Sequence, residues 1–124
     1  MSTVLVAGID EFSVQTLTWA LEAEGHKAVI ASNGSEAYAL VLSERPQFVF
    51  LEDALAVFSG LDTSAMLRAD PDVPAGLPIL VFGTVEPSRK ALDQGGATAF
   101  IAKNRLTLDL PELLGNLGGN APMW

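Results

Sequence analysis

The stretch Gln47-Phe48-Val49-Phe50-Leu51-Glu52-Asp53 (residues 47–53) sets four large apolar residues directly before two carboxylates. An apolar run without alternation is typical of a strand buried on both faces of a parallel sheet. Because Pro46 disfavours helix in the residue before it, a helix is expected to end ahead of this run. The stretch therefore predicts a central strand over residues 48–51, with Glu52 and Asp53 at its carboxyl end.

Similar apolar runs recur on both sides, and segments with helical spacing lie between them. The runs predict four further strands, over residues 3–7, 27–31, 77–82 and 98–102. Apolar spacing and end signals predict five helices, over residues 13–24, 36–44, 61–68, 87–94 and 110–117. Strands that alternate with helices indicate an α/β fold of three layers, with helices on both faces of a parallel sheet.

The end of the chain carries two signals. Asp109 and Glu112 form a capping-box pattern for the last helix, and Pro111 would be tolerated in its first turn. Beyond residue 117 the sequence is rich in glycine, which is typical of a flexible chain end. Since a domain takes roughly 100–200 residues, the 124 residues predict one domain over 1–117 and a flexible tail over 118–124.

Composition excludes several classes of function. Lys and Arg number 7 against 15 Asp and Glu, so the net charge of −8 repels nucleic acid and anionic lipid. The absence of cysteine removes thiolate metal sites and disulfide scaffolds. No apolar run approaches the roughly 20 residues of a membrane helix, and the first residues lack the pattern of a signal peptide. We therefore expect a cytoplasmic protein with no nucleic-acid or membrane partner.

In a parallel α/β sheet, functional sites lie at the carboxyl ends of the strands. The candidate residues are those that follow the predicted strands: Gly8, Ile9, Asp10, Glu52, Asp53, Gly83, Thr84 and Lys103. The loop after the first strand is not a glycine-rich phosphate cradle, which argues against a nucleotide or other small-molecule cofactor.

Landmarks and their spacing resemble one known family. Gly60 follows Glu52 by eight residues, Pro78-Ile79-Leu80-Val81 opens a strand, and Phe100-Ile101-Ala102-Lys103 ends another on a lysine. From Val4 to Leu114 the chain resembles the receiver domain of bacterial two-component response regulators. The resemblance implies a CheY-like, flavodoxin-like (βα)5 fold with strand order 2-1-3-4-5, and a role in phosphorelay signal transduction.

The residues that carry the family's chemistry are largely absent. The family holds magnesium with an acidic pair and a phosphoacceptor aspartate, and it uses a Ser or Thr and a lysine on the phosphoryl group. The acidic pair falls on Gly8 and Ile9, the acceptor on Glu52, and the hydroxyl position on Gly83. With only Lys103 retained, the resemblance implies a pseudo-receiver without catalytic residues, metal, cofactor or enzyme activity, which acts by phosphorylation-independent protein–protein interaction.

Several alternatives stay open at this pocket. A live phosphoacceptor could take phosphate from a histidine kinase through Asp53 or Asp10, and Thr84 could supply the missing hydroxyl. We expect Asp10 to begin the first helix, and Asp53 and Thr84 to point away from the pocket, because neighbouring residues of a strand face opposite sides. Lys103 is expected to pair with Glu52 across the top of the sheet, which would balance the charge without a metal.

The partner is expected to be a signalling protein: a kinase, an output protein or a second copy of the chain. By resemblance, the partner surface would be the face made by the fourth helix, fifth strand and fifth helix. Its residues would be Phe100, Arg89, Lys90, Arg105 and Leu106, with Leu108. Trp19 on the first helix and Phe58 in a loop are alternative contacts.

Overall fold

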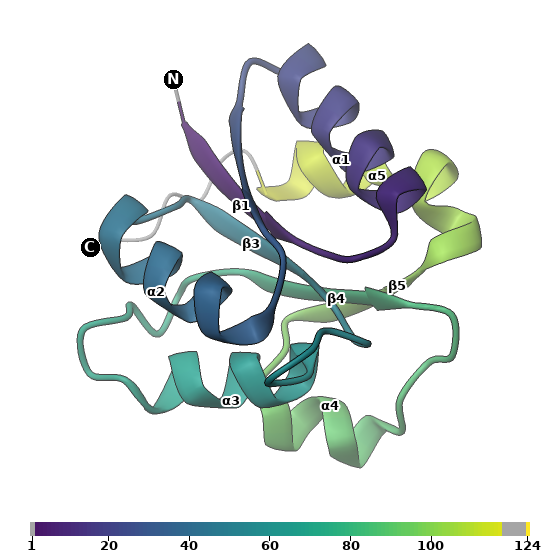
Figure 1. The fold of residues 1–124 in the computed structure, drawn as a ribbon. Coiled ribbons are helices and arrows are strands. Elements are labelled where there is room, and N and C mark those ends of the chain that lie inside the picture. Colours follow the sequence, from purple (N-terminus) through teal and green to yellow (C-terminus); the bar gives the residue numbers. More distant parts are fainter. Residues whose placement is uncertain (1, 118–123) are drawn as a thin grey trace.

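The computed structural model describes residues 2–117 and Trp124, and it has the expected alternation of strands and helices (Figure 1). The strands are β1 (Thr3–Ala7), β2 (Lys27–Ala31), β3 (Phe48–Glu52), β4 (Ile79–Gly83) and β5 (Ala99–Ala102). The helices are α1 (Glu11–Ala23), α2 (Gly34–Glu44), α3 (Gly60–Ala69), α4 (Arg89–Gly95) and α5 (Leu106–Leu117), with a 3-10 turn at Lys103–Arg105.

All five strands are parallel, in the order β2-β1-β3-β4-β5. This confirms the predicted α/β fold and strand order. The register places Ala7 beside Leu51 and Glu52 beside Phe82, so β1, β3 and β4 end at the same edge of the sheet. The loops that follow these three strands are therefore neighbours.

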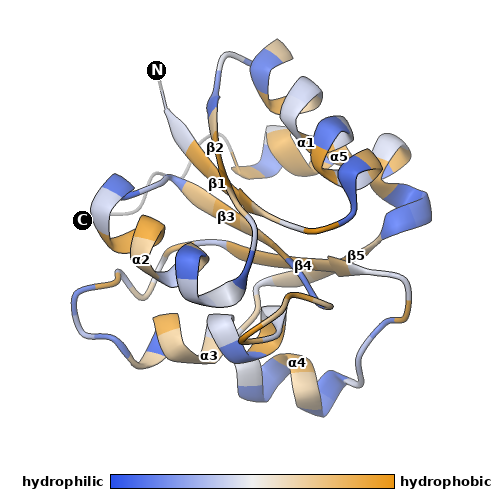
Figure 2. Ribbon diagram, in the orientation of Figure 1, coloured by the Kyte–Doolittle hydropathy of each residue, from blue (hydrophilic) through white to orange (hydrophobic). Residues whose placement is uncertain are grey.

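Alternate residues of the central strands feed two separate cores. On one face, Val4, Val6, Phe48 and Phe50 pack with leucines of α1 and α5. On the other face, the intervening residues of β1 and β3 pack with α2 and α3. Figure 2 shows the apolar strands between these helical layers. Burial on both faces explains why the strands are continuous apolar runs.

Three helices begin at side-chain caps. The side chains of Asn33, Ser59 and Ser88 each accept a hydrogen bond from a backbone N–H of the first turn of α2, α3 and α4. α4 ends at Gly96, whose φ of +70° is a conformation that favours glycine. No helix in the described part of the chain is long and apolar enough to cross a membrane.

The last helix differs from the prediction. It begins at Leu106 rather than at residue 110, because the 3-10 turn at Lys103–Arg105 continues directly into it. Asp109 is therefore inside the helix, where it pairs with Arg105, and the expected capping box is wrong. Pro111 lies within the helix rather than in its first turn.

Of the predicted tail, residues 118–123 lie outside the described residues, and Trp124 donates from Nε1 to the Pro46 carbonyl at 2.9 Å.

Candidate functional site

The centre of the candidate site is a buried carboxylate at the end of β3. Glu52 is the last residue of this strand, and its side chain is only 2% exposed. Its Oε1 accepts hydrogen bonds from the backbone N–H groups of Ile9 at 2.9 Å and Asp10 at 3.0 Å. Its Oε2 accepts from Lys103 Nζ at 2.8 Å. Each oxygen has a donor, as a buried charge requires.

The predicted pairing of Glu52 with Lys103 is confirmed, and the lysine has a second partner. Nζ of Lys103 also lies 3.2 Å from Oδ2 of Asp10, and its side chain is 24% exposed. The hydrogen bond to Glu52 raises the pKa of Lys103, although partial burial acts in the opposite direction. The pocket thus holds one ammonium group between two carboxylates.

Asp10 lies in the pocket, which corrects the expectation that it would only start the first helix. It does precede α1 as the N-cap residue, but its carboxylate also reaches Lys103. The strand alternation used for the prediction fails here because β1 ends at Ala7 and the chain has left the sheet. The hydroxyl of Ser13 donates to Oδ2 of Asp10 at 2.7 Å, and this bond, with Lys103, lowers the pKa of Asp10.

Gly8 leaves the space that the Glu52 carboxylate occupies. A Cβ added at Gly8 would lie 2.7 Å from Cγ2 of Val14 and 3.1 Å from Oε1 of Glu52. A side chain at position 8 would therefore meet both groups. Ile9 takes no part through its side chain, which is 57% exposed. Sequence reasoning missed Ser13 and Val14 because both have the ordinary pattern of a helix face.

On the β4 side, Gly83 faces an aromatic ring and a second acid. A Cβ at Gly83 would lie 3.3 Å from Cβ of Asp53 and 3.5 Å from Cε1 of Phe100. Asp53 forms no side-chain hydrogen bond or ion pair with any residue in the part of the chain that the structure describes. Burial raises the pKa of Asp53, and the nearby Asp62 adds to this effect. Thr84 is exposed and takes no part in the Glu52 contacts.

The pocket does not fit a divalent cation. Magnesium prefers octahedral oxygen ligands and usually takes one or two carboxylates with several waters. Here both oxygens of Glu52 already accept hydrogen bonds, and the lysine ammonium lies between Glu52 and Asp10. Among the described residues, no three Asp, Glu, His or Cys side chains gather as a metal site would need.

The expected partner face is less basic and less apolar than predicted. Arg89 pairs with Asp93 at 3.4 Å, and Arg105 pairs with Asp109 at 3.1 Å. Leu106 is only 2% exposed because it points into the core beside α1, so its assignment as a contact residue is wrong. Lys90 and Leu108 are exposed as expected. A groove of about 230 Å³ between β5 and α5 includes Phe100 but also two acids; its lining is Ala99, Phe100, Ile101, Asp109, Glu112, Leu113 and Asn116.

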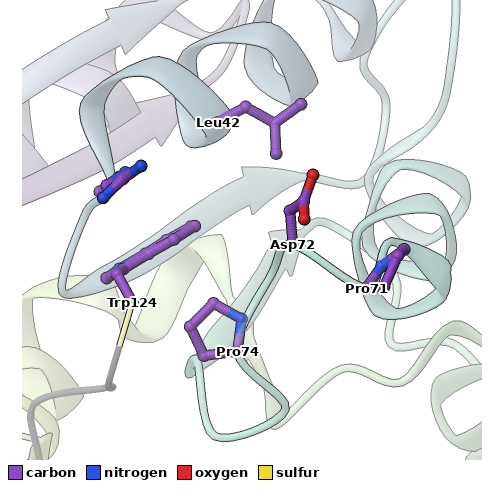
Figure 3. A pocket seen from close by; sticks show the side chains of 6 residues that line it. Leu42, Pro71, Asp72, Pro74 and Trp124 are labelled. Atoms are coloured by element: carbon purple, nitrogen blue, oxygen red, sulfur yellow. The ribbon is translucent and has the colours of Figure 1, made fainter.

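A cavity of about 600 Å³ lies apart from this site (Figure 3). Its lining is Leu42, Arg45, Pro71, Asp72, Pro74 and Trp124. The indole of Trp124 is held there by the Pro46 carbonyl, at the amino end of β3. Since Glu52 ends the same strand, the cavity and the carboxylate pocket lie at opposite edges of the sheet.

Comparisons with known proteins found similarity to a response regulator and to a transcriptional regulatory protein. No family model matches the chain. It is 24% identical over 103 residues to the polar-differentiation response regulator DivK of Brucella anthropi. The aligned region covers 82% of this chain and 83% of DivK. It is 34% identical over 97 residues to the probable transcriptional regulatory protein TcrX of Mycobacterium tuberculosis, which covers 76% of this chain but 40% of TcrX.

Solved structures give the same result for the fold. A putative response regulator from Chloroflexus aurantiacus superimposes with a TM-score of 0.84 at 22% identity, over 96% of this chain and 98% of the other. The receiver domain of the sensor histidine kinase PA1611 of Pseudomonas aeruginosa gives 0.83 at 17% identity, over 96% and 98%. That domain has a magnesium ion coordinated in its active site cleft.

Proposed function

We propose that the chain is a CheY-like receiver domain of the response regulator type, and that it is a signalling module that binds another protein without being phosphorylated. In this proposal it serves a two-component pathway, catalyses no reaction and carries no metal. The observation that carries the proposal is the closed set of contacts around Glu52. Its two oxygens are bound by Lys103 and by the backbone N–H groups of Ile9 and Asp10.

This arrangement opposes phosphoryl transfer in two ways. Transfer depends on a positioned nucleophile and on positive charge around the transferred group. A nucleophilic oxygen of Glu52 would have to react in a pocket where its side chain is 2% exposed and three donors already hold the carboxylate. The charge of Lys103 is already neutralised by Glu52 and Asp10, so it is not available to an incoming phosphoryl group.

Intact-mass spectrometry after incubation with acetyl phosphate and Mg²⁺ tests the proposal. We expect no mass gain of a phosphoryl group, and no change in amide NMR signals on titration with Mg²⁺. The metal-binding PA1611 receiver domain, treated in parallel, is the control for the reagents. A stoichiometric mass gain would contradict the proposal.

A second candidate is a phosphoacceptor at Asp10. The observation in its favour is that Asp10 lies 3.2 Å from Lys103 with 35% of its side chain exposed, so a small phosphodonor can reach it. In that case the mass gain would appear in the wild-type chain and disappear in Asp10→Asn. Asp53→Asn is the matched control, since Asp53 has no contact with Lys103.

A further inference from the structure

Exposed apolar side chains are concentrated in or next to the loops that follow β1, β3 and β4, at the end of the sheet where Glu52 lies. Eight large hydrophobic side chains are exposed in the described part of the chain, and five of them lie at the carboxyl edge of the sheet. We call these five the rim: Ile9, Phe12, Val57, Phe58 and Val85. Contiguous exposed apolar residues mark interaction sites far more often than scattered ones do.

The rim residues come from loops that the topology makes neighbours. β3 lies between β1 and β4, and adjacent strands are about 4.8 Å apart, so the loops after β1 and β4 begin about 10 Å from each other. The loop after β1 is tied to β3 by the hydrogen bond from Ile9 N–H to Glu52. Figures 1 and 2 show these loops at one edge, with apolar segments in those after β1 and β3.

The backbone at Val57 is strained. Its φ is +71°, a left-handed conformation that is a genuine outlier for a β-branched residue. The N–H of Phe58 donates to the carbonyl of Ala56 at 2.9 Å, which closes a γ-turn around Val57. γ-turns with positive φ are rare and strained. The side chain of Val57 is 70% exposed, so burial does not compensate for the strain.

Neighbouring groups hold this loop in its shape. The Ala56 carbonyl also accepts from Gly34 N–H at 3.0 Å, and Gly60 N–H donates to the Asp53 carbonyl at 3.1 Å. A Cβ at Gly34 would lie 2.3 Å from the Phe58 carbonyl oxygen, so α2 packs directly on the loop. Strain that is enforced by surrounding structure and leaves an apolar side chain in solvent is typical of functional loops.

Four acidic side chains beside the rim form no ion pair among the described residues, whereas Asp10, next to Ile9, is paired with Lys103. Asp53 and Asp62 flank the Val57 loop and form no ion pair there, and the exposed Glu11 and Glu86 stand next to Phe12 and Val85. With a net charge of −8, a second copy of the chain would bring acid against acid. A partner with basic residues around an apolar centre is complementary to this surface.

We propose that the rim is a docking surface for a protein segment with an apolar centre flanked by lysine or arginine. The proposal rests on the proposed function and names its surface and the chemistry of its partner. Val57 acts as the central contact, held outward by the γ-turn. The surface therefore lies over the closed pocket and not on α4, β5 and α5.

The test uses a synthetic amphipathic helical peptide with a leucine face flanked by lysines, and a second peptide with glutamate in place of lysine. Binding is followed by amide NMR shifts and by isothermal calorimetry. We expect the lysine peptide to shift signals in residues 8–12, 53–62 and 84–86, and the glutamate peptide to shift none. Val57→Asn, which tolerates the left-handed conformation, should weaken binding by about fivefold or more. The same variant should raise the urea midpoint of unfolding.

Leu108→Asn is the matched control, because Leu108 is 68% exposed, close to the 70% of Val57, and lies on α5. It should leave peptide binding unchanged. The proposal is overturned if Val57→Asn binds as tightly as the wild type, or if the shifts map to α4 and β5. It is also overturned if sedimentation shows a dimer that Val57→Asn abolishes, since the occupant would then be a second copy. A phosphoryl mass gain in the experiment with acetyl phosphate would contradict the proposed function but not the docking surface. Wild-type affinity of the Val57→Asn variant for the lysine peptide would contradict the docking surface but not the proposed function.

Discussion

Oε1 of Glu52 lies 3.1 Å from the point that a Cβ of residue 8 would occupy, so the glutamate fills the space above Gly8. The two residues are complementary. Glycine at position 8 makes room for the carboxylate of Glu52. Glutamate is one methylene longer than aspartate, and this length carries the carboxylate to the backbone N–H groups of Ile9 and Asp10. The carboxylate pocket is therefore occupied by an internal ion pair.

Both members of that ion pair should stabilise the fold, to different extents. Glu52→Gln keeps an acceptor for Ile9 and Asp10 and removes only the charge beside Lys103, so the free energy of unfolding should fall by about 1–2 kcal/mol. Lys103→Met leaves the more deeply buried charge of Glu52 without its cation and should cost about 3 kcal/mol. Urea denaturation measures both values. Equal effects, or none, would mean that the pair does not contribute as its burial implies.

Stability should also depend on pH at both ends of the range. The pKa of Lys103 is raised above its ordinary value of 10.5, so its contribution is complete below pH 10.5 and is lost as the pH rises through the higher folded value. The pKa of Asp10 is lowered from 3.8, so its contribution is present above pH 3.8 and is lost as the pH falls through the lower folded value. The free energy of unfolding of the wild type, Lys103→Met and Asp10→Asn, measured from pH 2 to 12, separates the contribution of Asp10 at acidic pH from that of Lys103 at basic pH. A difference from Lys103→Met that persists unchanged far above pH 10.5 would contradict the assignment.

Restoring one acid should not restore a metal site. In Gly8→Asp the new Cβ would lie 2.7 Å from Cγ2 of Val14, so the free energy of unfolding should fall by about 1–3 kcal/mol. Gly8→Asp with Val14→Ala relieves that contact and should recover part of the stability. Neither variant should bind Mg²⁺ in a calorimetric titration, because Lys103 still neutralises the carboxylates. Stoichiometric Mg²⁺ binding by the single variant would show that the ion pair is easily displaced.

Apolar runs were enough to predict the sheet, and tertiary contacts explain what the sequence could not show. Phe48–Glu52 is buried at every residue, so its pattern was clear. Asp10 begins α1 as expected, but the contact of its carboxylate with Lys103 was not expected, because strand alternation holds only while the chain is in the strand. The start of α5 was misplaced because Asp109 and Glu112 match a capping box by spacing alone.

The conformation of Val57 could not be predicted from its residue type. Local propensity opposes a left-handed valine. The turn is imposed by Gly34, which lies far away in the sequence and donates to the Ala56 carbonyl. The pairing of Lys103 with Glu52 could be predicted because the resemblance to receiver domains places the lysine opposite Glu52 and a half-buried lysine requires an acidic partner.

The last prediction concerns Gly83 and Phe100, whose ring packs against the glycine. The position of a Cβ at Gly83 is 3.5 Å from Cε1 of Phe100, an ordinary contact, but it is 3.3 Å from Cβ of Asp53, which is tight. Threonine adds two further atoms there, so Gly83→Thr should displace the Phe100 ring and lower the free energy of unfolding by about 1–2 kcal/mol. Gly83→Ala is the matched control, with the Cβ but without the atoms that would reach the ring. NMR spectra of chain labelled with fluorinated phenylalanine should show a new environment for Phe100 in Gly83→Thr and a smaller change in Gly83→Ala. An unchanged Phe100 signal in Gly83→Thr would mean that the ring does not depend on the missing side chain.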